Sequence, residues 1–100
     1  MPYFFCRLNA PRATFAVDMT GEEKALVQTH AAWWPGLTNR GVALLFGPVL
    51  DPNGPWGLGI IKAEDENEAR GLMAEDPVIK AAVGFAYEVL PMQIGMARSA

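Results

Sequence analysis

The order of strand-like and helix-like segments is the feature that most restricts the folds open to this chain. An aromatic-rich segment, 3–9, precedes a polar loop and an amphipathic segment, 20–40. Two further apolar segments, 42–50 and 56–63, flank Asp51-Pro52-Asn53-Gly54-Pro55, a run that favours a chain reversal. A helical pattern to about position 75 and a last strand, 85–92, complete the series. The order β-α-β-β-α-β predicts an α+β, ferredoxin-like fold: a four-stranded antiparallel sheet with both helices on one face.

Capping residues mark the ends of the predicted helices. Thr20 and Glu23 form a capping box, and Gly41 is expected to end the first helix in the left-handed conformation. Asp65 is expected to cap the second helix. Pro35 lies inside the first helix and removes one amide donor. The helix therefore either kinks beside His30 or breaks at Trp34.

Size and charge limit the class of protein. One hundred residues with 51% hydrophobic content predict a single domain, 1–94, followed by a tail, 95–100. The net charge of −3 and the lack of a lysine or arginine run argue against nucleic acid or an anionic membrane surface as a partner. No apolar run is long enough for a bilayer span, and no basic segment precedes the first one, so we expect a cytoplasmic protein.

Cys6 is the only cysteine in the sequence. It has no partner for an internal disulfide and cannot supply a cysteine cluster for zinc. A buried, unreactive thiol in the first strand is favoured over a nucleophile. We expect no metal and no organic cofactor.

Apolar residues occupy both faces of the predicted strands. In the third strand, for example, Trp56, Leu58 and Ile60 alternate with Gly57, Gly59 and Ile61. Two helices can cover only one face of the sheet, and the other would expose a large apolar patch. We therefore expect a homodimer packed sheet to sheet.

Arg7 and Glu88 are among the few charged residues in the strands. The first and last strands are antiparallel neighbours in this fold, so these two side chains form the obvious cross-strand pair. A structural ion pair is favoured over a role in binding a ligand, although Arg7 remains a candidate ligand-binding residue.

His30, the only histidine, falls on the apolar stripe of the first helix together with Leu26, Trp33 and Leu37. Its ring therefore faces the sheet. Such a histidine is often a core residue bonded to a backbone carbonyl, but an imidazole paired with a carboxylate is also a candidate general acid or base.

Asp76 continues the inward arc of the second helix at its end. A carboxylate there meets the negative end of the helix dipole and loses water, so it needs a partner. Asp76 is predicted to cap the turn that begins at Pro77, and its second oxygen remains free for His30. Asp51 is an alternative partner for His30, although initiation of the hairpin turn is its favoured role.

Glycine, proline and tryptophan outline a possible pocket between sheet and helices. Gly47 and Pro48 end the second strand, where a close backbone approach is expected. Trp33, Trp34 and Trp56 are candidate wall residues, although core packing is favoured for at least two of the three.

Five features of the sequence belong together: His30 in a first helix, the stretch Arg40-Gly41-Val42-Ala43-Leu44-Leu45-Phe46-Gly47-Pro48-Val49, a glycine-rich third strand, Asp76-Pro77 before an Ala-Gly turn, and a closing Tyr87-Glu88-Val89. In their order and spacing they resemble the YciI-like (YCII-related) family of the dimeric α/β barrel superfamily. The match spans nearly the whole chain, and Pro35 departs from it.

The resemblance implies a fold and a site. The fold is ferredoxin-like and assembles as a dimeric α/β barrel; the site has His30 and Asp76 as its histidine and aspartate, with Gly47 and Pro48 at the border of the pocket. Some members of the family resemble lyases or dehalogenating enzymes that act on small ring compounds. We expect a small enzyme without cofactor, of lyase, isomerase or hydrolase type. A binding or accessory protein without turnover and a cofactor-free monooxygenase are the alternatives.

Overall fold

The computed structural model of the chain describes residues 2–97. The elements, in chain order, are β1 (Tyr3–Asn9), α1 (Phe15–Asp18), α2 (Gly21–Asn39), β2 (Ala43–Val49), β3 (Trp56–Lys62), α3 (Glu66–Met73), α4 (Pro77–Lys80) and β4 (Ala86–Met92). The strands form one antiparallel sheet in the order β2-β3-β1-β4. This confirms the ferredoxin-like α+β fold. The predicted end of the domain at 94 stays a prediction, and residues 98–100 of the predicted tail lie outside the described part.

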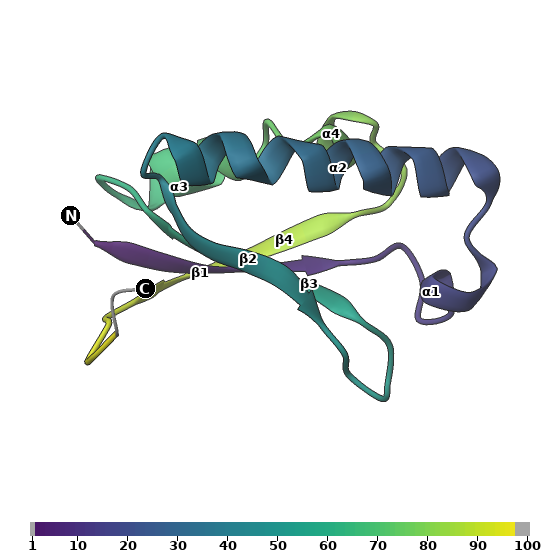
Figure 1. Cartoon of the computed structure of the whole chain (residues 1–100), viewed down its shortest axis with the longest axis horizontal. Coiled ribbons are helices and arrows are strands. Elements are labelled where there is room, and N and C mark those ends of the chain that lie inside the picture. The colour runs from purple at the N-terminus through teal and green to yellow at the C-terminus, as the bar shows by residue number, and fades with distance from the viewer. Residues whose placement is uncertain (1, 98–100) are drawn as a thin grey trace.

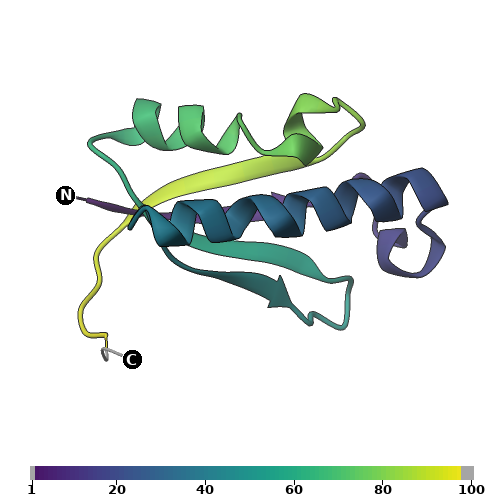
Figure 2. The same ribbon diagram turned by 45° about the horizontal axis from the view of Figure 1, so that its top comes forward.

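Helices α2, α3 and α4 lie on the same face of the sheet, with α2 running along its length (Figure 1). Turning the molecule shows α2 beside α3 and α4, above the strands (Figure 2). The opposite face carries no described helix. None of the helices within residues 2–97 has the length and apolar character needed to cross a membrane.

The alternation of side chains along β1 determines where the core forms. Phe4, Cys6 and Leu8 point to the helices and are buried. Cys6 lies directly between Gly59 of β3 and Val89 of β4. The main core contains Phe4, Cys6, Trp34, Leu37, Ala43, Ile61, Ala63, Ala69, Met73 and Val89. The core thus fills one end of the space between the sheet and α2, and the other end is left for a cavity.

Helix α2 begins and ends at the predicted residues. The Thr20 side chain accepts the Glu23 amide, the Glu23 side chain accepts the Thr20 amide, and Gly41 has a φ of 74°. The helix is continuous through Pro35, so the break at Trp34, one of the two alternatives that the sequence left open, does not occur. Trp34 and Leu37 are both buried against the sheet, on either side of the proline in sequence. Their packing compensates for the one hydrogen bond that Pro35 removes.

The loop expected before α2 contains a short helix, α1, which the sequence did not predict. Phe15 is buried at its start, with its ring edge-on to Phe85 at 5.1 Å between centroids. Arg12 and Thr14 hold the other end by hydrogen bonds to Asp18. Tertiary packing of one aromatic ring therefore orders a segment whose local sequence favours a loop.

The predicted neighbours Arg7 and Glu88 are opposite each other on β1 and β4. Their side chains approach to 3.6 Å between Nε and Oε2, and both are substantially exposed. The confirmed pairing is a surface contact of the kind that contributes little stability.

Candidate active site

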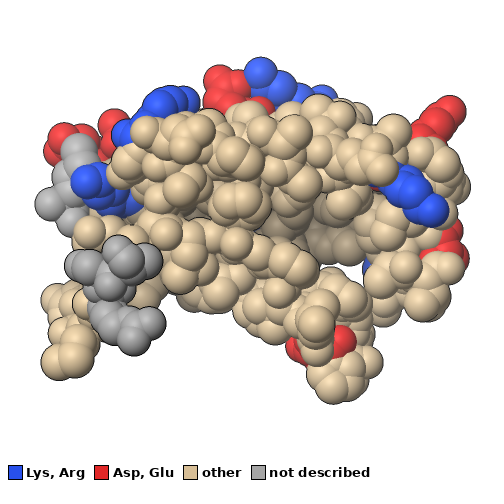
Figure 3. All heavy atoms as spheres, in the orientation of Figure 1, with Lys and Arg blue, Asp and Glu red and all other residues tan. Residues whose placement is uncertain are grey.

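A cavity of about 380 Å³ opens between α2 and the sheet. In the space-filling view the surface is hollowed beneath the helical layer, between the β2–β3 hairpin and the end of the molecule that carries α1 (Figure 3). The lining is mostly aliphatic and aromatic and consists of Leu8, Ala10, Phe15, Ala16, Met19, Val27, His30, Ala31, Trp34, Phe46, Gly47, Pro48, Pro55, Trp56, Gly57, Leu58, Gly59, Val78, Phe85 and Tyr87. Among these residues only His30 and Tyr87 carry titratable side chains.

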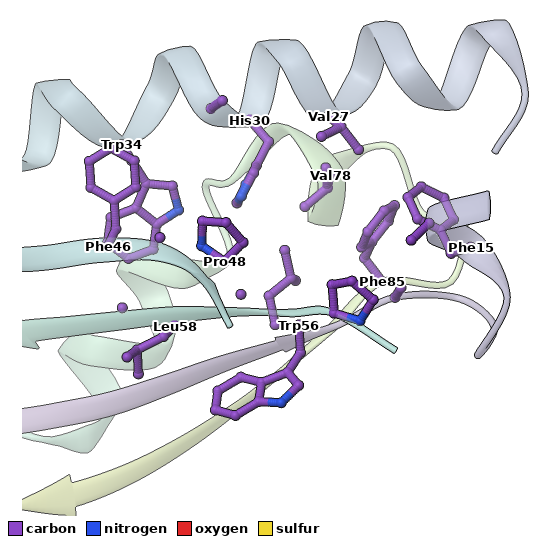
Figure 4. Close-up of a pocket in the computed structure, with 18 of the residues that line it drawn as sticks. Phe15, Val27, His30, Trp34, Phe46, Pro48, Trp56, Leu58, Val78 and Phe85 are labelled. Carbon is purple, nitrogen blue, oxygen red and sulfur yellow. The ribbon is translucent and has the colours of Figure 1, made fainter. Parts of the chain in front are cut away.

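His30 reaches from α2 into the space beneath the helix (Figure 4). Its Nδ1 lies 2.7 Å from Oδ2 of Asp76, and 18% of its side chain is exposed. The carboxylate accepts, so Nδ1 carries the hydrogen and the neutral ring has its lone pair on Nε2. Asp76 therefore holds the imidazole at Nδ1, and Nε2 remains free for a ligand.

Asp76 is fully buried, with 0% of its side chain exposed. It caps α4: Oδ1 accepts the amide hydrogen of Val78 at 3.0 Å, and Pro77 occupies the first position of the helix. Oδ2 accepts from both His30 and Tyr87. All three partner groups are donors, so Asp76 acts only as an acceptor. The helix cap uses Oδ1, and the contact with His30 uses Oδ2.

Tyr87 is the polar residue of this site that sequence reasoning missed. Its hydroxyl donates to Oδ2 of Asp76 at 2.5 Å. Burial raises the pKa of this phenol well above its usual range, and the hydrogen bond to Asp76 adds to the effect. A signal was present in the sequence, because the alternation of β4 places Tyr87 on the inward face, where a tyrosine hydroxyl needs a partner.

Trp34 and Phe46 form one wall of the cavity. Their rings stack at 5.5 Å between centroids and 15° between planes. The Trp34 indole packs against β3 at Gly59, where a Cβ atom would come within 2.9 Å of Cζ2 of the indole. The glycine of the third strand therefore makes room for a tryptophan, which is the close approach that glycine in a strand often indicates.

Gly47 and Pro48 both line the cavity, as the sequence suggested. Trp33 and Arg7 do not belong to the lining. Trp33 packs edge-on against Trp34 and is partly buried beside the core. The Arg7 guanidinium lies over the Trp56 ring, 4.2 Å from its centroid, and lines a smaller adjoining pocket instead.

Asp51 is engaged within the hairpin and does not pair with His30. It accepts the Asn53 amide at 2.8 Å and the Trp56 indole N–H at 3.2 Å. These bonds lower the pKa of Asp51, the Asn53 amide contributing most. Of the two carboxylates considered as partners of His30, Asp76 is the one within hydrogen-bond distance.

No group of three or more His, Cys, Asp or Glu side chains suited to a metal ion occurs within residues 2–97. The Cys6 thiol is buried in the core, and burial raises its pKa to about 12. Its protonated form is a poor metal ligand and a poor nucleophile at neutral pH.

Comparison with known proteins finds solved structures of similar fold, among them one dehydrochlorinase. The 5-chloro-2-hydroxyhydroquinone dehydrochlorinase TftG from Burkholderia phenoliruptrix AC1100, solved in complex with 2,5-dihydroxybenzoquinone, superposes with a TM-score of 0.61 at 21% identity. The match covers 95% of this chain and 96% of that one. No curated protein sequence matches the chain. The family model of the YCII-related domain matches residues 1–93, and the chain therefore belongs to the YCII-related family.

Proposed function

We propose that this protein is an acid/base enzyme without cofactor, of lyase, isomerase or hydrolase type, that acts on a small ring compound. His30 exchanges a proton with the substrate and Asp76 orients it. The observation that carries the proposal is the 2.7 Å contact between Nδ1 of His30 and a fully buried carboxylate, at the wall of an open apolar cavity. A histidine used only for packing would not need a buried charge as its partner.

The two residues have different access to a ligand. Asp76 has no exposed surface and cannot touch a bound molecule. His30 lines the cavity, and its Nδ1 is already occupied by Asp76. Nε2 is therefore the atom that takes up the proton, and Asp76 stabilises the positive charge that the ring then carries.

The lining supports a flat, largely apolar substrate. A volume of about 380 Å³ lies within the range of small-molecule sites and suits a single substituted ring. The stacked pair of Trp34 and Phe46 offers one aromatic wall, and Phe15 and Phe85 lie at the other end of the cavity (Figure 4). Aromatic side chains bind the faces and edges of rings favourably.

An elimination fits these residues. Nε2 of His30 takes a proton from a C–H or O–H bond of the substrate. The electron pair of a C–H bond forms a new C=C bond, whereas that of an O–H bond forms a C=O bond and displaces ring π-electrons; in either case a leaving group departs with the electrons of its bond to carbon. Support comes from the dehydrochlorinase of similar fold, whose name states the loss of hydrogen chloride from a chlorinated ring.

The proposal includes a homodimer and a cytoplasmic location. Leu45 and Leu90 are exposed on the sheet face opposite the helices, and a second copy of the chain would cover them. Sedimentation velocity at micromolar concentration tests this part, and a monomer would contradict it. In the cytoplasm the lone Cys6 stays reduced.

A substrate screen with matched variants tests the enzymatic role. The panel contains substituted phenols, quinols and small ring acids, with 5-chloro-2-hydroxyhydroquinone as the chlorinated member and chloride release as its readout. His30→Asn should reduce the turnover of any substrate by about a hundredfold or more. Gln28→Asn, at an exposed position of the same helix, should leave it unchanged.

Two outcomes would overturn the enzymatic role. One is wild-type turnover by a folded His30→Asn variant. The other is binding of 2,5-dihydroxybenzoquinone or other panel members without turnover of any of them, which would identify a binding protein.

A further inference from the structure

Tyr87 is built into the site from the far side of Asp76. It lies opposite Leu8 in the β1–β4 pairing, and this register directs its side chain toward the helices. The hydroxyl reaches Oδ2 of Asp76 at 2.5 Å, and the ring lines the cavity. Tyr87 thus touches both the carboxylate and the space where a ligand would bind.

The two donors from His30 and Tyr87 share one oxygen atom. Oδ1 of Asp76 is taken by the Val78 amide, so both meet at Oδ2. Each hydrogen bond partly neutralises the negative charge of the same oxygen atom, and a short hydrogen bond from a phenol does so strongly. The hydroxyl of Tyr87 therefore lowers the charge that Asp76 presents to the imidazole.

Tyr87 keeps its proton at neutral pH. Burial first, and the neighbouring carboxylate second, raise the pKa of the phenol. It is therefore a permanent donor to Asp76 and does not act as a base toward the ligand.

The other elements packed around α2 bring few charges toward His30. Cys6 of β1 is buried and protonated. Glu88, next to Tyr87 on β4, approaches Arg7 on the opposite face of the sheet. Lys80 of α4 pairs with Glu75 at the surface, at 2.7 Å between Nζ and Oε2. Strands β2 and β3 contribute no titratable side chain to the cavity lining.

We propose that Tyr87 is a positioning residue that fixes Asp76 and weakens the hydrogen bond between Asp76 and the His30 imidazolium. The competition of His30 and Tyr87 for the same oxygen of Asp76 does not depend on any substrate. Its meaning for turnover rests on the proposed function.

The test is an NMR titration of the His30 imidazole in untagged protein, where it is the only histidine. Tyr87→Phe removes one donor from Oδ2, so the titration midpoint should move to higher pH by about half a pH unit or more. Tyr3→Phe, at the only other tyrosine, should leave the midpoint in place. An unchanged or lower midpoint in folded Tyr87→Phe would overturn the proposal.

A second variant keeps the shape of the Tyr87 side chain and should shift the titration midpoint of His30 in the opposite direction. Incorporation of 3-fluorotyrosine in the Tyr3→Phe background places the analogue at position 87 alone. Its more acidic hydroxyl is a stronger donor, so the midpoint should move to lower pH. A midpoint that does not move, or that moves upward, would contradict the proposal even if Tyr87→Phe fails to fold.

Activity measurements separate this inference from the proposed function. With a substrate from the panel, the acidic limb of the kcat/KM profile should follow the shifted midpoint in Tyr87→Phe, and KM should change little. If His30→Asn is fully active, the proposed function fails, and the titration still decides the role of Tyr87.

Discussion

Two hydrogen-bonded clusters lie along α2 and use the same chemistry in different surroundings. The surface cluster is Arg12, Asp18 and Glu23 at the beginning of the helix; the buried cluster is His30, Asp76 and Tyr87 halfway along it. In each, one carboxylate collects several donors. Glu23 accepts both terminal nitrogens of Arg12 at 2.8 Å and the amide of Thr20 at 2.9 Å.

The difference lies in burial and in what remains free. The surface cluster faces water and caps the helix. The buried cluster is closed to water on the Asp76 side and open to a cavity on the His30 side. A carboxylate that accepts several hydrogen bonds is common and does not by itself indicate a functional site. It indicates one where a donor residue, like His30, also has a free hydrogen-bonding atom that faces a cavity.

The largest expected effect comes from removing the buried carboxylate. Asp76→Ala leaves His30, Tyr87 and the Val78 amide without their acceptor and should cost about 3 kcal/mol of the free energy of unfolding. Asp65→Ala is the control, because Asp65 caps α3 through the Glu68 amide and pairs with no histidine. It should cost about 1 kcal/mol. Urea unfolding measures both, and equal losses would show that Asp76 contributes no more than an ordinary helix cap.

A smaller loss is expected where the cavity wall meets the sheet. Gly59→Ala forces the Trp34 indole away from β3 and should cost about 2 kcal/mol, with a smaller cavity as a second effect. Gly71→Ala is the matched control, since a Cβ there meets no atom and α3 gains helix propensity. It should raise the free energy of unfolding by about 0.5–1 kcal/mol. Chemical denaturation followed by tryptophan fluorescence checks the two opposite signs.

Alkaline pH should weaken the buried region. Burial raises the pKa of Cys6 from 9.0 to about 12 and that of Tyr87 above its ordinary 10.0. The folded state then holds more protons, so this stability is complete below pH 9 and is lost as pH rises toward 12. Thermal unfolding between pH 8 and pH 11 should show a falling Tm, with a shallower slope in Cys6→Ala. An identical slope in that variant would remove Cys6 from the explanation.

Acid pH should weaken the surface cluster, with the smallest effect. The hydrogen bond from Arg12, followed by that from the Thr20 backbone, lowers the pKa of Glu23 from 4.5 to about 2. The folded state binds fewer protons, so the contribution is present above pH 4.5 and is lost as pH falls to 2. Glu23→Gln should flatten the acid limb of the plot of the free energy of unfolding against pH. At neutral pH, added salt should change the free energy of unfolding of this variant only slightly. A steep remaining acid limb would assign acid unfolding to other carboxylates.

The sequence predicted those parts of the fold that depend on local chemistry. The capping box at Thr20, the left-handed Gly41, and the cap at Asp76 are decided by residues a few positions apart, and all three are confirmed. The short helix α1 and the unbroken path of α2 through Pro35 depend on burial against distant residues, which no local window contains. Tertiary packing decided these two features.

The candidate site followed the same division. Spacing along α2 and α3 placed His30 and Asp76 on inward faces, and the structure brings them to 2.7 Å. Trp33 has a similar spacing, yet the helix turns it to the edge of the core and Trp34 toward the cavity. Tyr87 was not assigned to the site because it follows a strand pattern, in which an inward tyrosine looks like any other apolar residue until its hydroxyl finds a partner.

The cavity divides its polar and apolar parts between different elements. The hydrogen-bonded side chains of His30, Asp76 and Tyr87 come from α2, the residue before α4, and β4, whereas most of the apolar walls come from β2, β3 and the segment around α1. An exchange of wall residues such as Phe46 or Phe15 would therefore change the shape of the cavity and leave the hydrogen bonds among His30, Asp76 and Tyr87 intact. In such a layout the set of ligands that fit the cavity can change one aromatic ring at a time, independently of the polar cluster.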